Sequence, residues 1–428
     1  MRRILTVLVV AFFAVTSQQS NGQQPPPSPN TVGAPEPTKQ STVPGTQETQ
    51  STDAVAPEQG NAAEQGKGNT AAAPEGDAAA APNNNTPRPS NRASRRSRFL
   101  SSRRPSYRLA RAPAMFGDSI LTDTFDVAGV GFGTFLGQER NKIADNGSVL
   151  PRDRNYLDFR YFHNAVSFDD VGGVFVSEPV ERYRFGFERT ISVNGNTSVE
   201  VRIPLTGGGN TATPGLMNDA DGFGNIAVIL KHLLYRSDNF LVSGGVGINT
   251  PTGEDIRFRI PGLFTDVRIR NEAWHIQPFL GFLSTPDNRL FVNGFAQLDV
   301  AANGSDVLTN GINEGALHPA TVLNVDIGAG YWLVRHASGN GGHFTGVAVV
   351  AETHYTGNLT SADSVLAAGG DMRVGGLIGQ MHILNATVGL HGTLNESTAI
   401  RIGYSVPLTD RSNRSFDGEL ILSLIRRT

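Results

Sequence analysis

Charged side chains are the residues of this chain whose types and spacing could do chemistry. Basic ones recur in the first half of the C-terminal region, at Arg160, Arg182, Arg184, Arg202 and Lys231. Acidic ones follow further along the chain, at Asp299, Asp326 and Glu352. If their strands close on one another, the two sets form a basic and an acidic wall of one space, and such a field can select among polar solutes. The same charges could instead hydrate that space or hold an inserted segment.

Pairing across two predicted turns gives these charges specific neighbours. The turn at 194–196 places Glu188 opposite Arg202, which predicts a salt bridge. The turn at 337–342 places Asp326 opposite Glu352. Because like charges directly opposite one another are unfavourable, this acidic pair needs water, a cation, a nearby base or a bound proton.

Motifs of enzymatic catalysis are absent from the sequence. It has no Gly-x-Ser-x-Gly elbow, no His-Glu-x-x-His and no P-loop. Two histidines that we expect to face lipid, His163 and His232, have no serine-bearing motif beside them. The lack of cysteine excludes disulfides and thiolate metal sites. We therefore expect neither an enzyme nor a site for a metal or a cofactor.

Stretches with a strict period of two position these side chains. In 182–193, 199–206, 321–333 and 400–408, apolar and polar residues alternate. Side chains on a strand point to opposite faces in turn, so each stretch has one apolar side and one polar side. In a membrane barrel the apolar side meets lipid and the polar side lines a wet lumen. A soluble sandwich with one buried face alternates in the same way.

The connections between these stretches distinguish the two folds. Short turns lie at 194–196, 237–239, 285–288, 337–342 and 394–396. Long connections lie at roughly 169–179, 207–222, 250–270, 303–318, 358–379 and 409–415. Short and long alternate without exception, as in transmembrane barrels, whose periplasmic turns are tight and whose outer loops are free to grow. Residues 155–428 are therefore predicted to form an all-β, transmembrane, antiparallel up-and-down β-barrel of about 12 strands.

Three segments precede the predicted barrel. Residues 1–22 begin with Met-Arg-Arg and continue into an apolar run, which is typical of a signal peptide and predicts export to the outer membrane. Residues 23–97, dominated by Pro, Gln and Ala, should form a disordered linker, either a spacer or an arm that reaches a cell-envelope polymer. Residues 98–154 are a basic segment and a candidate plug or collar. Nucleic acid is not expected as a partner of an exported chain.

Two further groups of residues stand out on the predicted strands. An aromatic patch points into the lumen, at Phe279, Phe291, Phe295 and Trp332. It could bind apolar solutes or pack against an inserted segment such as 112–137. Beyond the membrane span, alternation continues through a basic ribbon that carries Arg257, Arg259, Arg268 and Arg270. We expect this ribbon to project outside the cell, where it could contact anionic lipopolysaccharide, fold over the pore mouth or stay a solvated hairpin.

The middle of the chain resembles a known family of outer-membrane proteins. Residues 223–236 (FGNIAVILKHLLYR) are followed by 242–255 (VSGGVGINTPTGED), a Gly-rich strand that ends in Pro-Thr-Gly. This pattern is similar to the family labelled putative MetA-pathway of phenol degradation. The resemblance implies a barrel linked to the uptake of aromatic or other hydrophobic compounds.

The sequence thus predicts an outer-membrane channel for passive uptake of small solutes, hydrophobic or aromatic compounds among them. Its expected partners are outer-membrane lipid, lipopolysaccharide and those solutes. A structural envelope protein, with a plugged barrel and a periplasmic tether, is the main alternative. An exported soluble β-sandwich is a third reading of the same alternation.

Overall fold

The computed structural model describes residues 106–119, 122–128, 131–136, 140–170, 175–207, 211–213, 216–219, 222–260, 265–335, 345–376, 381–394, 397–410 and 414–428. All of them belong to one compact unit, Arg88–Thr428. The predicted signal peptide, the predicted disordered linker and the first residues of the basic segment lie outside these ranges.

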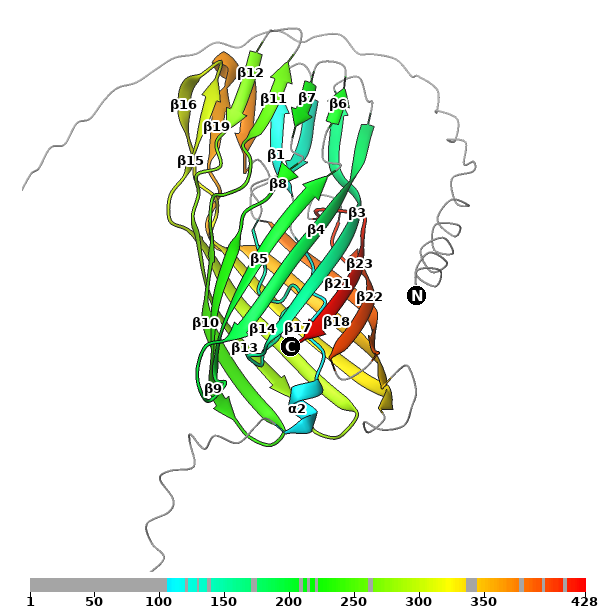
Figure 1. Ribbon diagram of the computed structural model, residues 1–428. Coiled ribbons are helices and arrows are strands. Elements are labelled where there is room, and N and C mark those ends of the chain that lie inside the picture. Colours follow the sequence, from blue (N-terminus) through cyan, green and yellow to red (C-terminus); the bar gives the residue numbers. More distant parts are fainter. Residues whose placement is uncertain are drawn as a thin grey trace, which may run out of the picture. The chain divides into compact units, whose positions relative to one another are not determined.

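Twelve antiparallel strands of the described residues close into a barrel (Figure 1). In order around the wall they are β3 (Arg154–Asp170), β4 (Phe175–Thr190), β5 (Thr197–Gly207), β9 (Ala227–Arg236), β10 (Phe240–Asn249), β13 (His275–Ser284), β14 (Leu290–Ala301), β17 (Val322–Arg335), β18 (Gly346–Asn358), β21 (His382–Thr393), β22 (Thr398–Pro407) and β23 (Gly418–Arg427). The last strand pairs with the first, from Gly418↔His163 to Arg427↔Arg154. The predicted fold class is confirmed, and closure of the sheet excludes the soluble sandwich.

The two faces of the wall have opposite polarity. On β4, Tyr183 and Phe185 point outward and are 40% and 46% exposed, whereas Arg182 and Arg184 point inward and are buried. A soluble protein would bury the aromatic side chains and expose the arginines. The arrangement fits a wall whose outer face meets lipid.

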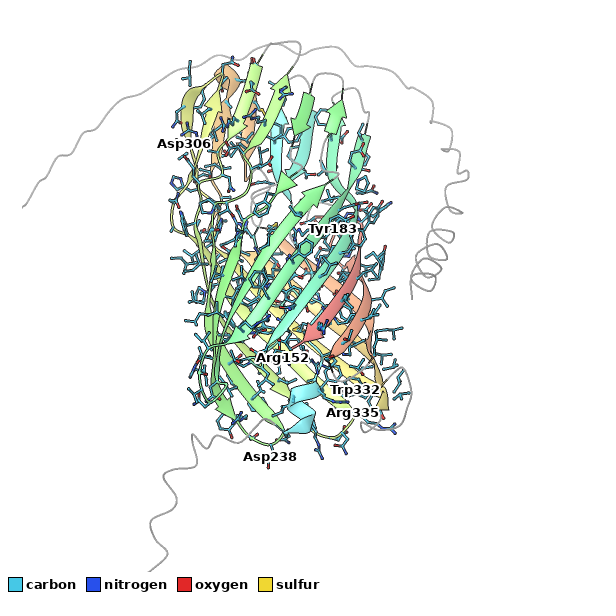
Figure 2. All side chains as sticks on the ribbon, viewed as in Figure 1. Arg152, Tyr183, Asp238, Asp306, Trp332 and Arg335 are labelled. Carbon is cyan, nitrogen blue, oxygen red and sulfur yellow. The ribbon has the colours of Figure 1, made fainter. Side chains whose placement is uncertain are left out.

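Short turns join the strands at one end, the lower end in Figure 1. In the turn between β13 and β14, the Asp287 carboxylate accepts hydrogen bonds from the backbone N–H groups of Leu290 (2.7 Å) and Arg289 (2.6 Å). These bonds favour the charged carboxylate and lower the pKa of Asp287. Figure 2 places Asp238 and Arg335 at the same end. Tight turns mark the periplasmic side of an outer-membrane barrel.

At the other end, the long connections fold into further strands, which we call the cap. One group continues the barrel sheet and comprises β1 (Thr122–Val127), β2 (Gly131–Leu136), β19 (Ser364–Ala367) and β20 (Met372–Gly375). The single 3-10 turn η2 (Ala368–Gly370) joins β19 to β20. The short β8 (Gly222–Phe223) pairs with β5. The other group is a separate six-stranded sheet: β6 (Thr211–Thr213), β7 (Leu216–Asp219), β11 (Ile256–Ile260), β12 (Thr265–Ile269), β15 (Ser305–Thr309) and β16 (Ile312–Leu317).

The two groups of cap strands share one apolar core. Phe125 of β1 stacks on Phe168 of β3, with ring centroids 5.9 Å apart, and meets Phe258 of β11 at 5.3 Å. Met372 and Val267 are buried in the same cluster. The cap is therefore a packed two-sheet body, because each sheet offers an apolar face that only the other sheet covers.

The predicted basic ribbon corresponds to β11 and β12, but it does not project freely. β11 pairs with β7 on its far side, and β12 pairs with β15. A lone hairpin would leave Phe258 and Val267 in water, so their burial against the other cap sheet favours incorporation into a larger sheet. The expectation of a free ribbon is wrong for this reason.

An inner segment of the chain runs through the lumen before the barrel begins. It comprises α2 (Tyr107–Arg111), a first pass (112–119), the cap hairpin β1–β2 and a second pass (140–150) that leads to β3. Below the barrel, the Ser106 hydroxyl donates to the carbonyl of Asp238 in a short turn (2.6 Å). Both passes are buried along their whole length from 112 to 119 and from 141 to 150. The chain therefore rises through the barrel, adds a hairpin to the cap and returns.

The two passes touch where Gly117 meets Asp145. Gly117 has φ +71°, and a Cβ atom at this position would lie 2.5 Å from the Cα of Asp145. Only glycine fits both the left-handed backbone and the close approach.

In the part of the chain that the structure describes, no helix is long and apolar enough to cross a membrane.

Candidate functional site

The basic wall is folded around one carboxylate of the inner segment. Arg160 forms ion pairs with Asp145 and with Glu419 of β23, and Arg184 lies 2.5 Å from the second oxygen of Asp145. Arg182 donates to the hydroxyl of Ser119 on the first pass (3.1 Å). All these groups are buried. The predicted basic residues of β3 and β4 thus gather at one point and bind the segment that fills the lumen.

A second cluster lies where β4, β5 and β9 meet. Arg154 pairs with Glu188 (2.7 Å) and Glu200 (3.2 Å), and Lys231 lies 3.0 Å from Glu188. Arg202 holds Glu200 at 2.9 Å and donates to the carbonyl of Lys142 on the second pass (2.7 Å). Three cations therefore offset two carboxylates that stand side by side.

The predicted partner of Glu188 is wrong by two residues. Glu188 lies opposite Glu200, and Arg202 lies opposite Gly186. The turn closes earlier than expected, because the N–H of Gly195 bonds to the carbonyl of Ser192 (2.9 Å). This closure shifts every pair on the two strands together.

The acidic wall is also occupied. Asp299 accepts from His275 (2.7 Å) and Gln277 (2.9 Å). Glu352 accepts the backbone N–H groups of Phe116 (2.8 Å) and Gly117 (2.9 Å) on the first pass. Two of the three predicted acidic residues therefore accept hydrogen bonds from the wall or from the first pass.

Asp326 has a base opposite it rather than a second carboxylate. The structure pairs Asp326 with His354 and Glu352 with Gly328, so the predicted Asp326–Glu352 pair is wrong. The strands are already shifted beside the turn, where Val334 lies opposite Val347, and a bulge near Trp332 changes the register by one residue. The imidazole of His354 lies 2.9 Å from Asp326, and the ammonium group of Lys142 lies 3.1 Å from it. His354 therefore supplies the nearby base that Asp326 was predicted to need.

Asp118, Asp326 and His354 present potential metal ligands within 4.8 Å of one another. Lys142 of the second pass, however, forms ion pairs with both carboxylates. Its ammonium group takes the place between the carboxylates that a metal ion would need. The cluster acts as an ionic contact between the inner segment and the wall.

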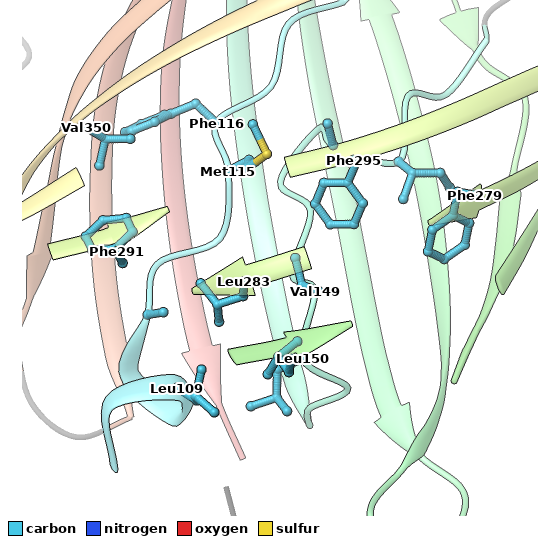
Figure 3. Packing of buried hydrophobic residues seen from close by; sticks show 14 of the residues in the cluster. Leu109, Met115, Phe116, Val149, Leu150, Phe279, Leu283, Phe291, Phe295 and Val350 are labelled. Atoms are coloured by element: carbon cyan, nitrogen blue, oxygen red, sulfur yellow. The ribbon is translucent and has the colours of Figure 1, made fainter. Parts of the chain in front are cut away.

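The aromatic patch is covered by the inner segment. Phe279 and Phe295 have ring centroids 6.3 Å apart, as do Phe291 and Trp332. All four are buried in one cluster with residues of both passes, among them Met115 and Leu150. Figure 3 shows Met115 and Phe116 of the first pass between Phe291 and Phe295 of the wall. Of the two predicted uses of the patch, packing against an inserted segment is the contact present here.

The arginines of β11 and β12 lie on the cap sheet. Arg257 and Arg259 are exposed, and Arg259 stands opposite Asp266. Arg268 forms an ion pair with Asp255, and Arg270 lies 3.5 Å from Glu272 and 3.6 Å from Asp306. Figure 2 shows Asp306 at this end of the molecule. Neighbouring carboxylates offset much of the predicted positive charge.

Sequence reasoning missed how the wall holds the backbone of the inner segment. Arg401 of β22 donates to the carbonyls of Ala114 (2.8 Å) and Met115 (2.9 Å). Arg154 donates to the carbonyl of Asn146 (2.8 Å), and Gln297 accepts the N–H of Ile143 (2.7 Å). Backbone groups carry no sequence signal, so only the inward register of Arg401 could have suggested such a role.

Comparisons with known proteins find weak structural likeness alone. Neither a protein-family model nor a curated protein matches the sequence. The COG4313 outer membrane channel from Pseudomonas putida F1 is 9% identical, with a TM-score of 0.45 over 65% of this chain and 96% of that one. A Pseudomonas aeruginosa FadL homologue is 9% identical, with a TM-score of 0.36 over 72% and 100% of the two chains. The P. putida toluene transporter TodX is 13% identical, with a TM-score of 0.39 over 75% and 93%.

Proposed function

We propose that this protein is an outer-membrane channel for passive uptake of small solutes, and that its inner segment acts as a plug. The observation that carries the proposal is the polar contact between plug and wall. Arg401, Arg154 and Glu352 bind the plug through its backbone groups. Because such hydrogen bonds can be exchanged for bonds to water, the first pass can shift within the barrel and open a wet, charged path.

The proposed solutes are hydrophobic or aromatic compounds. Phe279, Phe291, Phe295 and Trp332 form an apolar surface in the lumen, and the plug covers it in this conformation. Withdrawal of the plug would offer this surface to an apolar solute. The resemblance of 223–255 to the family linked to phenol degradation supports the same substrate class.

Charge selection is a further part of the proposal. Asp299, Asp326 and Glu352 lie on β14, β17 and β18, whereas the predicted basic residues lie on β3, β4, β5 and β9. An open lumen would therefore have an acidic side and a basic side, which favours orientation of a polar solute during passage. Outer-membrane lipid is the partner of the apolar outer face.

A deletion series tests the channel. Removing 23–119 takes away the first pass but keeps β1–β2 in the cap sheet. Single-channel recordings in planar bilayers should then show a larger and steadier conductance than the full-length mature protein does. Removal of 23–105 is the matched control, because it leaves every described contact in place, and its conductance should equal that of the full-length protein.

A structural envelope protein remains the second candidate, and one observation favours it. β1 pairs with both β2 and β20, so the plug is joined to the cap and cannot leave the barrel entirely. A chain fixed at that end could tie the barrel to an envelope polymer through its N-terminal arm. If the protein without 23–119 inserts into bilayers, is correctly folded and still does not conduct, the channel proposal fails and this candidate replaces it.

A further inference from the structure

Two arginines meet at one position on the outer face of the barrel, near the end that carries the short turns (Figure 1). Asn155, the second residue of β3, is exposed there. Arg426 of β23 is its direct partner on one side, so their Cβ atoms lie about 5 Å apart. From the other side, the guanidinium group of Arg189 on β4 donates to the side-chain oxygen of Asn155 (2.8 Å). Both arginines are exposed and lie beside the same asparagine.

The backbone of the wall fixes the guanidinium group of Arg189. Its Nη1 atom donates to the carbonyls of Arg154 (3.0 Å) and Glu188 (2.8 Å). Together with Asn155 these are three acceptors, and none of them carries a charge, so they orient the cation without neutralising it. A side chain that is already ordered loses little entropy when it binds a further group.

The positive charge of this position exceeds its negative charge. Among the residues that the structure describes, no ion pair joins Arg189 or Arg426 to an acidic side chain. Asp153, two residues before Asn155, uses one oxygen to accept the backbone N–H (2.6 Å) and the hydroxyl group (2.9 Å) of Thr190. Two cations thus stand near one carboxylate that already has donors, and the local field attracts an anion.

An apolar surface begins beside these cations, on the side toward the middle of the strands. Phe187 of β4 is the second partner of Asn155. Two residues further along β3, Leu157 lies between Leu424 and Phe185. All four apolar side chains are exposed on the outer face. Since β3 begins and β4 and β23 end at the short turns, the cations lie at the edge of the span and the apolar side chains lie within it.

We propose that Arg189, Asn155 and Arg426 form a binding site for the phosphate of an anionic phospholipid in the periplasmic leaflet of the outer membrane. A guanidinium fork matches two phosphate oxygens, and the apolar surface beside it receives the acyl chains. The excess positive charge selects phosphatidylglycerol over phosphatidylethanolamine, whose ammonium group it repels. The site lies outside the lumen, so the inference does not depend on whether the pore opens.

Lipid binding to the full-length mature protein in maltoside micelles tests the site. In a native mass spectrometry titration, the wild type should bind dioleoylphosphatidylglycerol more tightly than dioleoylphosphatidylethanolamine. Arg189→Gln and Arg426→Gln should each weaken phosphatidylglycerol binding about fivefold, because each removes one cation near the lipid surface. Neither should weaken phosphatidylethanolamine binding. Inorganic phosphate should not displace the bound lipid, because it makes no contact with the apolar surface. Heat-modifiable mobility on gels verifies that each variant is folded.

Arg289→Gln is the matched control. Arg289 is also exposed at the end with the short turns, six strands from β3 around the wall, and its guanidinium carbon lies 5.9 Å from the ring centroid of Tyr331. This variant should keep the phosphatidylglycerol affinity of the wild type. If it weakens binding as much as Arg189→Gln and Arg426→Gln do, any cation near the membrane is sufficient and the site is refuted. A wild type that binds both lipids equally, or that exchanges its lipid for inorganic phosphate, refutes the site as well.

A measurement on the wild type keeps the proposal testable if the variants do not fold. Because salt screens exposed charges, a high salt concentration should weaken phosphatidylglycerol binding and leave phosphatidylethanolamine binding unchanged. An equal response of the two lipids would overturn recognition by the arginines.

Discussion

At the scale of residues, buried ion pairs hold the inner segment in the lumen. Lys142 stands between Asp118 and Asp326, and all three side chains are almost fully buried. Removing one partner of such a network leaves an uncompensated charge away from water. An exposed pair such as Arg270 and Glu272 contributes far less, because water screens it.

Lys142→Met should therefore lower the free energy of unfolding by about 3–5 kcal/mol. Arg270→Met, with a side chain that is 43% exposed, should cost less than about 1 kcal/mol. Urea titration of both variants in detergent measures the difference. Similar small costs for the two would mean that Lys142 does not neutralise buried carboxylates.

The contact between the two passes gives a second prediction at this scale. Gly117→Ala introduces a Cβ atom 2.5 Å from the Cα of Asp145 at a position with φ +71°. The strained backbone alone costs about 1–3 kcal/mol, and the clash adds to it. Gly195→Ala has a similar φ, +69°, with no atom within 4 Å, and so reports strain without the clash. The contact is refuted if both variants unfold at the same urea concentration.

Sequence alone predicted which residues face inward but not what they bind. The inward orientation of Arg160, Asp326 and Glu352 follows from the local alternation of polar and apolar residues. Their partners depend on register, and register depends on where each turn closes, as at Gly195. The contacts of Glu352 and Arg401 with the plug involve backbone atoms more than 200 positions away, which no local pattern encodes.

At the scale of elements, each barrel strand keeps its apolar side toward lipid. Leu280, near the middle of β13, is 57% exposed on that side. Leu280→Arg should make folding into a bilayer less favourable by about 2–4 kcal/mol, whereas Leu280→Val should change the folding free energy little. Folding titrations into lipid vesicles measure both. Equal values for the two variants would show that this face does not contact hydrocarbon.

The cap depends on a hairpin that comes from outside the barrel sequence. Phe125 of β1 is buried between the two cap sheets, whereas Phe132 of β2 is 39% exposed. Phe125→Ala should cost about 3–5 kcal/mol and make the cap connections sensitive to protease, but Phe132→Ala should do neither. Resistance of the cap in both variants would contradict the shared core.

The elements of the cap were the least predictable part of the fold. β1 and β2 lie in a Gly-rich region without alternating charge, so the sequence left plug and collar open. β11 and β12 showed their alternation clearly. Their sheet partners, β7 and β15, follow from burial of Phe258 and Val267, which is a tertiary effect.

At the scale of the whole molecule, alternating loop length was enough to predict a closed barrel of the observed strand number. The alternation of short and long connections runs along the entire chain, so a small error at a single turn does not change it. The content of the lumen is a different matter, because a polar wall fits water and a polar plug equally well. The structure describes an inner segment that the wall binds by charge and backbone contacts.

The most direct test of a channel closed by its own plug changes the wall side chains that bind the first pass and keeps the chain whole. Glu352→Gln/Arg401→Gln weakens the hold on 114–117, while Arg270→Gln/Glu272→Gln disrupts an exposed pair as a control. In planar bilayers the first variant should open often to the conductance of the protein without 23–119, and the control should behave as the wild type. Gating by these contacts would be contradicted if the Glu352→Gln/Arg401→Gln variant stayed as closed as the wild type while the protein without 23–119 conducted.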